Sequence, residues 1–112
     1  MVKIGQGNVT SGNACQGVLR VVESVEDVLG LLKEDISATI LFTPTASATI
    51  MTPLFPRIKG VVCSTGGATS HVAIVAREFD LYCIMGVQFD YQGELDGCAI
   101  SMNTEGEIFT QS

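Results

Sequence analysis

The sequence has a single histidine, no tryptophan and only six lysines and arginines in 112 residues. Its twelve acidic residues give a net charge of −6 at pH 7, and charged residues make up only 16% of the chain. Because binding the phosphate backbone of a nucleic acid requires a basic surface, this composition argues against nucleic acid as a partner. The low fraction of charged residues indicates that part of the surface contacts another protein.

The sequence also lacks the spacing of a metal site. It has no CxxC pair and one histidine, so the four widely spaced cysteines, Cys15, Cys63, Cys83 and Cys98, do not match a zinc-binding pattern. We interpret them as structural thiols that pack as small hydrophobic groups. No signal peptide and no apolar run of about 20 residues is present. We therefore expect a cytoplasmic protein with no membrane partner.

The length and the apolar content predict one domain over residues 1–112. A chain of this size with 46% hydrophobic residues can bury one core, and neither a linker nor an internal repeat divides it. Residues Gly5–Gly17 are rich in turn formers and predict a loop with a brief strand. Apolar runs predict strands at Val18–Val22, Thr39–Phe42, Ile58–Ser64 and Tyr82–Val87, and a final hairpin of Cys98–Met102 and Glu107–Thr110 across Asn103–Gly106.

The first predicted helix begins at Ser24. Ser24 is a good N-cap residue, and Asp27 three residues later completes an approximate capping box. Apolar residues then recur at helical spacing, and we expect one core-facing side made of Val25, Val28, Leu29 and Leu32.

The second predicted helix begins at His71. Apolar residues lie on more than one side of it, so we expect it to be sandwiched between two layers. Between the two helices, Pro53 limits any helix in the segment Ala46–Phe55.

His71 is the candidate for chemistry. It follows a glycine pair and opens an apolar helix, where unpaired backbone N–H groups and the positive end of the helix dipole favour an anion such as phosphate. Gly66 and Gly67 let the backbone turn tightly and let a bulky anion approach. Either Thr69 or Ser70 can cap the helix and place a hydroxyl beside the imidazole. The pattern is typical of a phosphoryl acceptor.

A longer stretch makes the interpretation specific. Residues 60–86, GVVCSTGGATSHVAIVAREFDLYCIMG, resemble the mobile phosphohistidine domain of phosphoenolpyruvate-utilising enzymes, whose signature is a glycine pair, one residue, TSH and an apolar helix containing AR. Residues 7–17, 40–44 and 96–109 resemble other parts of that domain. The family includes pyruvate phosphate dikinase, phosphoenolpyruvate synthase, enzyme I of the sugar phosphotransferase system and the rifampicin phosphotransferases.

The resemblance implies both a fold and a site. The fold would be α/β, a swivelling β/β/α domain built as a compact sandwich of strands and short helices. His71 would carry a phosphoryl group on Nε2, Thr69 would position the phosphoryl group or the imidazole, and Gly66, Gly67 and Ser70 would form the binding loop. The domain would bind no cofactor. Mg²⁺ with ATP or phosphoenolpyruvate would be held by a nucleotide-binding or phosphoenolpyruvate-binding partner domain, and neither fits within this length.

Two other classes of function stay open. The chain could be a regulatory docking module in which His71 is phosphorylated as a signal, without turnover of its own. It could also be a hydrolase or lyase that uses His71 as a general base, which requires a carboxylate to orient the imidazole. The nearest carboxylate after the motif is Glu78.

Overall fold

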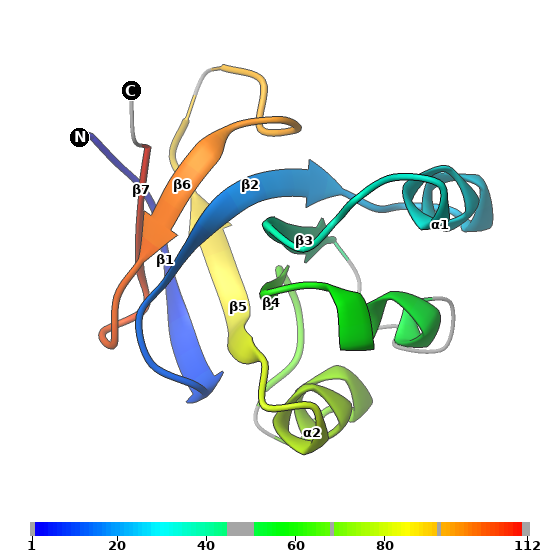
Figure 1. The fold of residues 1–112 in the computed structure, drawn as a ribbon. Coiled ribbons are helices and arrows are strands. Elements are labelled where there is room, and N and C mark those ends of the chain that lie inside the picture. The colour runs from blue at the N-terminus through cyan, green and yellow to red at the C-terminus, as the bar shows by residue number, and fades with distance from the viewer. Residues whose placement is uncertain (1, 45–50, 68, 92, 111–112) are drawn as a thin grey trace.

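The strands close into a barrel that is covered on one side by helices (Figure 1). The computed structural model describes residues 2–44, 51–67, 69–91 and 93–110, and in these ranges seven strands follow the order β1-β5-β4-β3-β2-β6-β7 around the barrel. The elements are β1 (Val2–Ser11), β2 (Cys15–Val21), α1 (Val25–Leu32), β3 (Thr39–Thr43), the 3₁₀ helix η1 (Thr52–Arg57), β4 (Gly60–Cys63), α2 (His71–Glu78), β5 (Tyr82–Phe89), β6 (Ala99–Met102) and β7 (Glu107–Thr110).

The strands in the half of the barrel next to the helices are parallel to one another. Strands β2, β3, β4 and β5 are parallel neighbours, and α1, η1 and α2 form the crossovers between them. Every residue of β3 and β4 is buried, as expected for parallel strands that are covered on both faces. The four strands point the same way, so their carboxyl ends meet at one edge of the sheet. The loop that leads to His71 leaves β4 at this edge.

Two hydrophobic cores lie on opposite faces of these strands. Because side chains alternate along a strand, Val61 packs beneath the helices while Val62 points into the barrel. The same alternation sends Leu41 to the helical side and Ile40 to the barrel interior. The sheet is therefore held from both sides, and α2 rests on a rigid support.

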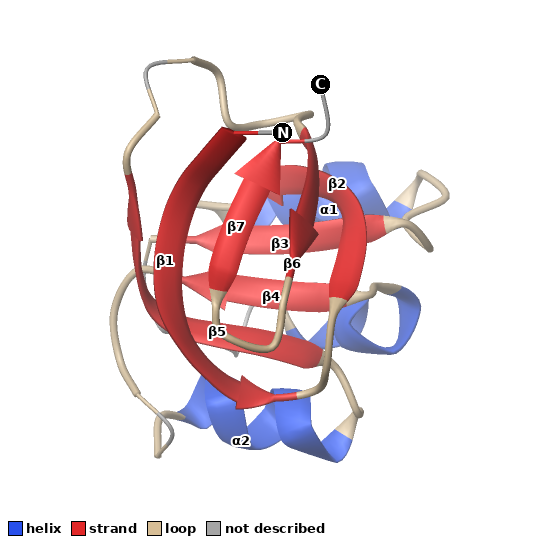
Figure 2. Ribbon diagram, turned by 90° about the vertical axis from the view of Figure 1, so that its left-hand side faces the viewer, coloured by secondary structure: helices blue, strands red, loops and turns tan. Residues whose placement is uncertain are grey.

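Strands β1, β6 and β7 close the barrel, as Figure 2 shows, and the end of β1 reaches helix α2. Val2 of β1 pairs with Thr110 of β7, so the two ends of the described chain lie next to each other. The β6–β7 hairpin across residues 103–106 confirms the sequence-based prediction.

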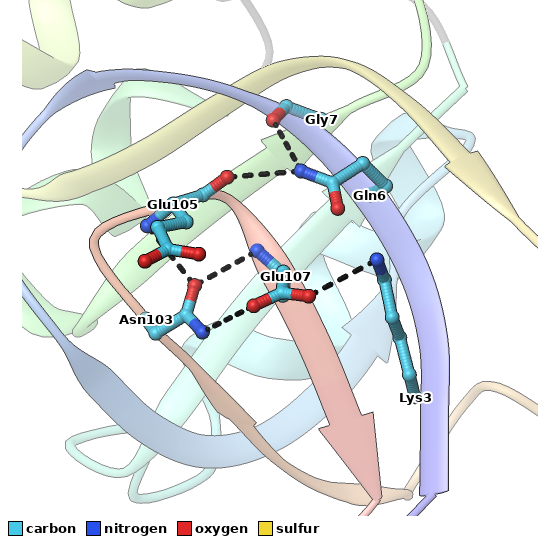
Figure 3. A network of polar contacts seen from close by, with 6 residues as sticks. All are labelled: Lys3, Gln6, Gly7, Asn103, Glu105 and Glu107. Carbon is cyan, nitrogen blue, oxygen red and sulfur yellow. Dashed lines mark hydrogen bonds and ion pairs between the residues drawn. The ribbon is translucent and has the colours of Figure 1, made fainter.

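A polar network ties the β6–β7 turn to β1 (Figure 3). The Asn103 side-chain oxygen accepts the backbone N–H groups of Glu105 and Glu107, each at 3.0 Å, and its Nδ2 donates to the Glu107 carboxylate at 2.9 Å. The other carboxylate oxygen lies 3.1 Å from the Lys3 ammonium. The hydrogen bond from Asn103, followed by the one from Lys3, lowers the pKa of Glu107. The network fixes the seam at which the last strand meets the first.

The prediction for the N-terminal segment is wrong. Residues 5–17 were expected to form a loop with a brief strand, whereas β1 is a ten-residue strand that pairs with both β5 and β7. Its glycines allow close packing instead of turns: a Cβ on Gly7 would lie 2.3 Å from Cγ2 of Ile84. A closed barrel also replaces the expected sandwich of strands, although the mixture of strands and short helices in one compact unit is confirmed.

The core face predicted for α1 is also wrong in part. The capping box of Ser24 and Asp27 is present, and Val28 is buried. However, the other three residues expected on the core face are exposed: Val25 is 55% exposed, Leu29 54% and Leu32 37%. Leu31 is buried in the core instead. Of the segment Ala46–Phe55, residues 46–50 lie outside the described ranges, and Pro53 lies in the 3₁₀ helix η1.

Tyr82 links β5 to the same hairpin. Its hydroxyl donates to the backbone carbonyl of Asn103, and its side chain is only 3% exposed. Burial disfavours the charged phenolate and raises the pKa of Tyr82 to about 12.

We predict that the stabilising effect of the Tyr82 hydroxyl depends on pH. At pH 8, Tyr82→Phe should lower the free energy of unfolding by about 1 kcal/mol, because a buried hydrogen bond is lost. In the unfolded chain the tyrosine ionises near its usual pKa of about 10, so the wild-type advantage is fully present below pH 10 and is lost as the pH rises toward 12. Urea unfolding at pH 8 and pH 11.5 measures the difference in the free energy of unfolding between the wild type and Tyr82→Phe. An equal difference at both pH values would contradict the prediction.

Candidate functional site

The β4–α2 connection presents His71 to solvent. The turn begins at Ser64, whose N–H donates to the Thr43 carbonyl at 3.2 Å, and ends where the Ser70 N–H donates to the Gly67 carbonyl at 3.0 Å. His71 is the first residue of α2 and is exposed. Since Val72 and Ala73 point into the core, helix geometry directs His71 outward.

Ser70 caps the helix, which settles an alternative that the sequence left open. Its backbone is extended, and its hydroxyl accepts the Ala73 N–H at 3.4 Å. Thr69 is exposed and lies directly before the cap. The two hydroxyl residues therefore differ, because the Ser70 hydroxyl caps the helix whereas Thr69 is exposed.

The glycine turn includes a residue in the left-handed region. Gly66 has φ +91°, a conformation that a residue with a side chain adopts only with strain. Around Gly67 the space is open, since a Cβ there would have no heavy atom within 4 Å. Residue 68, which completes the motif, lies outside the described residues.

Two residues beside this turn were missed by sequence reasoning. Gly86 of β5 has φ +64°, and a Cβ there would lie 3.6 Å from the Gly66 carbonyl oxygen and 3.8 Å from Nδ2 of Asn8. Asn8 comes from β1, where it pairs with Met85 next to an irregularity in the register. No local sequence signal identifies Asn8, because only the pairing of β1 with β5 brings its amide near the turn.

The charge around the start of α2 favours an anion. The first turn of α2 contains no acidic residue, whereas the first turn of α1 contains Glu26 and Asp27. The positive end of the α2 dipole is therefore not offset by a carboxylate of its own first turn. Among the described residues, the structure gives the His71 side chain no hydrogen bond or ion pair, so no carboxylate in these ranges orients its imidazole in the way that a general base requires.

The predicted sandwiching of α2 is wrong. Val72, Ala73 and Ala76 are buried on one side, but Ile74 is 42% exposed and Phe79 is 40% exposed. Helix α2 therefore has a single core-facing side and an outer side that includes His71.

Cys63 and Cys83 lie in the core under α2 and are both buried. Burial raises the pKa of each thiol, which keeps the unreactive protonated form. All four cysteines are free thiols, and Cys15 and Cys98 are only partly buried. The described residues contain no group of three or more histidine, cysteine or acidic side chains that could hold a metal ion.

A cleft of about 550 Å³ lies at the other end of the parallel strands. Its walls include Cys15, Lys59 and Tyr82, which stand at or just before the starts of β2, β4 and β5. The cleft is therefore separate from the His71 turn, which follows the end of β4.

A search of the described ranges for helices that could cross a membrane finds none of sufficient length and hydropathy.

These features define a class: a small α/β barrel domain that presents one exposed histidine at the start of a capped helix. The family of phosphoenolpyruvate-utilising enzyme mobile domains matches residues 36–106, which include the whole β4–α2 unit. The chain belongs to this family.

Two relatives show the context in which such a domain occurs. The rifampicin phosphotransferase of Bacillus subtilis strain 168 is 36% identical over 103 residues, which are 91% of this chain and 11% of that protein. A probable phosphoenolpyruvate synthase of Methanothermobacter thermautotrophicus is 28% identical over 81 residues, or 72% of this chain and 11% of that protein. The chain thus spans about a tenth of the length of these two relatives.

A solved structure confirms the fold independently of sequence. Thermococcus kodakaraensis aconitase X superposes with a TM-score of 0.67 over the full length of both chains, at 16% identity. At that identity the likeness concerns the fold alone.

We predict that the two neighbouring hydroxyl residues contribute differently to stability. Ser70→Ala should lower the free energy of unfolding by about 1 kcal/mol, because the N-cap hydrogen bond is lost. Thr69→Ala should change it by less than about 0.5 kcal/mol, since the side chain is exposed. Chemical denaturation of both variants tests this prediction, and a larger loss for Thr69→Ala would contradict the capping assignment.

Proposed function

We propose that this domain is a phosphoryl carrier in which His71 accepts a phosphoryl group at one site and delivers it to another. The observation that carries the proposal is the exposed histidine at the capped, acid-free start of α2, within the matched family segment. In a carrier the reacting nitrogen must be reachable from outside, and His71 meets this requirement because the core-facing side of α2 is formed by other residues.

The reaction is a displacement at phosphorus. The Nε2 lone pair of neutral His71 attacks the phosphorus of the donor, an N–P bond forms, and the P–O bond to the leaving group breaks with its electron pair on oxygen. Backbone N–H groups at a helix N-terminus favour negative charge, which supports a phosphoryl group at the start of α2. We assign to the exposed Thr69 hydroxyl the role of donating to a phosphoryl oxygen or of orienting the ring. In the second transfer, the acceptor oxygen attacks phosphorus and the N–P bond breaks.

The glycine turn gives the phosphoryl group room. A Cβ on Gly67 would have no heavy atom within 4 Å, which supports our assignment of this turn as the place that receives the phosphoryl group. Gly66 supplies the left-handed bend that turns the chain from β4 toward α2. The Ser70 hydroxyl holds the first turn of the helix and thereby the direction of His71.

The donor and acceptor sites belong to partner domains in this proposal. We assign Mg²⁺ with ATP, or phosphoenolpyruvate, to a nucleotide-binding or phosphoenolpyruvate-binding domain, because the rifampicin phosphotransferase and the probable phosphoenolpyruvate synthase are about nine times as long as the segment that matches this chain. The adjacent ends of the described chain support a swivelling motion. Since Val2 pairs with Thr110, connections on both sides would leave from one place and allow the barrel to turn as a rigid body.

Transfer of a radioactive phosphoryl group to the chain tests the proposal, and the single histidine identifies the position that is labelled. His71 is the only histidine, so any phosphohistidine in this chain must be at this position. Cell extract serves as the source of partner domains, and radioactively labelled phosphoenolpyruvate or ATP serves as the donor. The wild type should then carry an acid-labile, base-stable label, and His71→Asn should carry none.

The matched control is Thr69→Ala, which should reduce the rate of labelling and leave the site of labelling unchanged. An acid-stable label on the wild type, or an equal label on His71→Asn, would contradict the carrier role.

A further inference from the structure

One end of the barrel is open to solvent as the cleft of about 550 Å³. Its walls come from the ends of five strands: the loop after β1, the starts of β2, β4 and β5, and the last residues of β6. The loop from β1 to β2 lies at the lower end of the barrel in Figure 1. We call this cleft the barrel mouth and define it by residues 12–16, Lys59, Asp80, Tyr82 and residues 101–102.

The size and position of the barrel mouth suit a small molecule. Ligand sites commonly occupy the mouths of β-barrels and enclose about 300–1,000 Å³. Two of the residues that line the mouth, Tyr82 and Met102, are only 3% and 2% exposed and belong to the core inside the barrel. The Tyr82 hydroxyl is held by the Asn103 carbonyl. The mouth therefore has a fixed and largely apolar base.

Two opposite charges line the barrel mouth without pairing with each other. The Lys59 ammonium donates to the backbone carbonyl of Gln16 at 3.2 Å. Burial raises the pKa of the Cys15 thiol, and the Lys59 ammonium beside it lowers that pKa in part. Within the described ranges, neither Lys59 nor Asp80 takes part in an ion pair, so their charged groups lie more than 4.0 Å apart.

These two charges indicate the class of ligand. A simple anion would meet Lys59 but would be repelled by Asp80 and by a chain of net charge −6. A simple cation would meet Asp80 and would be repelled by Lys59. A ligand that carries both charges meets both groups at once, and an apolar part covers the base of the mouth. The α-amino acids combine these features in a small molecule.

We infer that the barrel mouth binds a small zwitterion of the α-amino acid class, with its carboxylate toward Lys59 and its ammonium toward Asp80. This site is separate from the candidate phosphoryl site. His71 begins α2 and Asp80 follows its end, so the length of an eight-residue helix, about 12 Å, lies between them. The inference goes beyond the proposed carrier function, and each can fail without the other.

The first test titrates the ¹⁵N-labelled 112-residue chain with the proteinogenic amino acids, one at a time, and records its nuclear magnetic resonance spectrum. We expect at least one amino acid to bind with a Kd of about 1 mM or lower. The amide shifts should concentrate in residues 12–16 and at Lys59. No binding by any amino acid at about 10 mM, or shifts confined to the glycine turn before His71, would overturn the inference.

Two analogues of the amino acid that binds most tightly test whether both charges are needed. The corresponding amine lacks the carboxylate, and the corresponding carboxylic acid lacks the ammonium. Each should bind about tenfold more weakly than the amino acid, because each loses one charged contact. If either analogue binds as tightly as the amino acid, the ligand is not recognised as a zwitterion and the inference fails.

Substitutions assign each charge of the ligand to a side chain. Lys59→Gln should weaken binding of the amino acid about tenfold and leave binding of the amine unchanged, because the amine has no carboxylate for Lys59 to meet. Asp80→Asn should weaken binding of the amino acid and of the amine, but not of the carboxylic acid. Asparagine also tolerates the left-handed backbone of residue 80, where φ is +57°.

The matched controls remove the same charges elsewhere. Lys33→Gln and Glu26→Gln change exposed residues at helix α1, outside the barrel mouth. Each should change the Kd of the amino acid by less than about twofold, because exposed charges that do not touch the ligand are screened by solvent. Equal effects of the control and mouth substitutions would show a general effect of net charge and would overturn the site.

Cys15 provides a readout that needs no substitution. It lines the barrel mouth, whereas Cys98, which is also only partly buried, does not. Iodoacetamide alkylates a thiolate by forming a carbon–sulfur bond with loss of iodide. The bound amino acid should slow alkylation of Cys15 in proportion to the fraction of occupied sites and leave Cys98 unaffected. An unchanged rate at Cys15 under saturating amino acid would contradict binding in the mouth.

Phosphorylation of His71 by phosphoramidate separates the two sites. The N–P bond of phosphoramidate breaks, ammonia leaves, and a new N–P bond forms on the imidazole. The rate should be the same with and without the amino acid. Inhibition by the amino acid would place it at the glycine turn and overturn the inference. Absence of phosphohistidine in the wild-type chain would count against the carrier function alone.

Discussion

The packing of α2 against strands β5 and β1 determines the position of His71. The helix approaches closely because Ala73 and Ala76 on its inner side are small and fully buried. Once Val72, Ala73 and Ala76 face inward, the residue before them must face outward. The exposure of His71 thus follows from the burial of its neighbours, and a larger residue at position 73 or 76 would move the histidine with the helix.

The strand that leads into the turn, β4, provides a rigid support for it. Each residue of β4 is buried, and its side chains alternate between the helical core and the barrel interior. Shifting β4 by one residue would exchange the two sets of side chains between the cores. The turn that follows β4 is consequently anchored at both of its ends, by backbone pairing at Ser64 and by the Ser70 cap.

The sequence predicted the parts of the structure that depend on local patterns. The glycine turn, the helix start at His71 and the final hairpin were predicted from neighbouring residues, and the family resemblance was confirmed by the match over residues 36–106. The choice between Thr69 and Ser70 as the cap needed the structure, because both hydroxyls satisfy the sequence preference and only the backbone conformation of the turn decides between them.

Long-range packing explains what the sequence could not predict. Strand β1 contains glycines because side chains of β5 fill the space beside it. The sequence does not show this close packing, because it depends on the pairing of β1 with β5. Leu29 and Leu31 are equally apolar, and only the orientation of α1 on the sheet buries one and exposes the other. Asn8 lies near the His71 turn through a pairing between strands that are more than seventy residues apart.

Nuclear magnetic resonance of the ¹⁵N-labelled domain after treatment with phosphoramidate tests the central claim most directly. The account predicts one phosphorylated ring nitrogen, identified by its coupling to phosphorus, together with chemical-shift changes concentrated in the amides of the glycine turn and the first turn of α2. We expect these amides to respond because backbone N–H groups at a helix N-terminus favour negative charge. An unmodified His71 ring, or amide shifts confined to other parts of the barrel, would contradict the claim that this helix start receives a phosphoryl group.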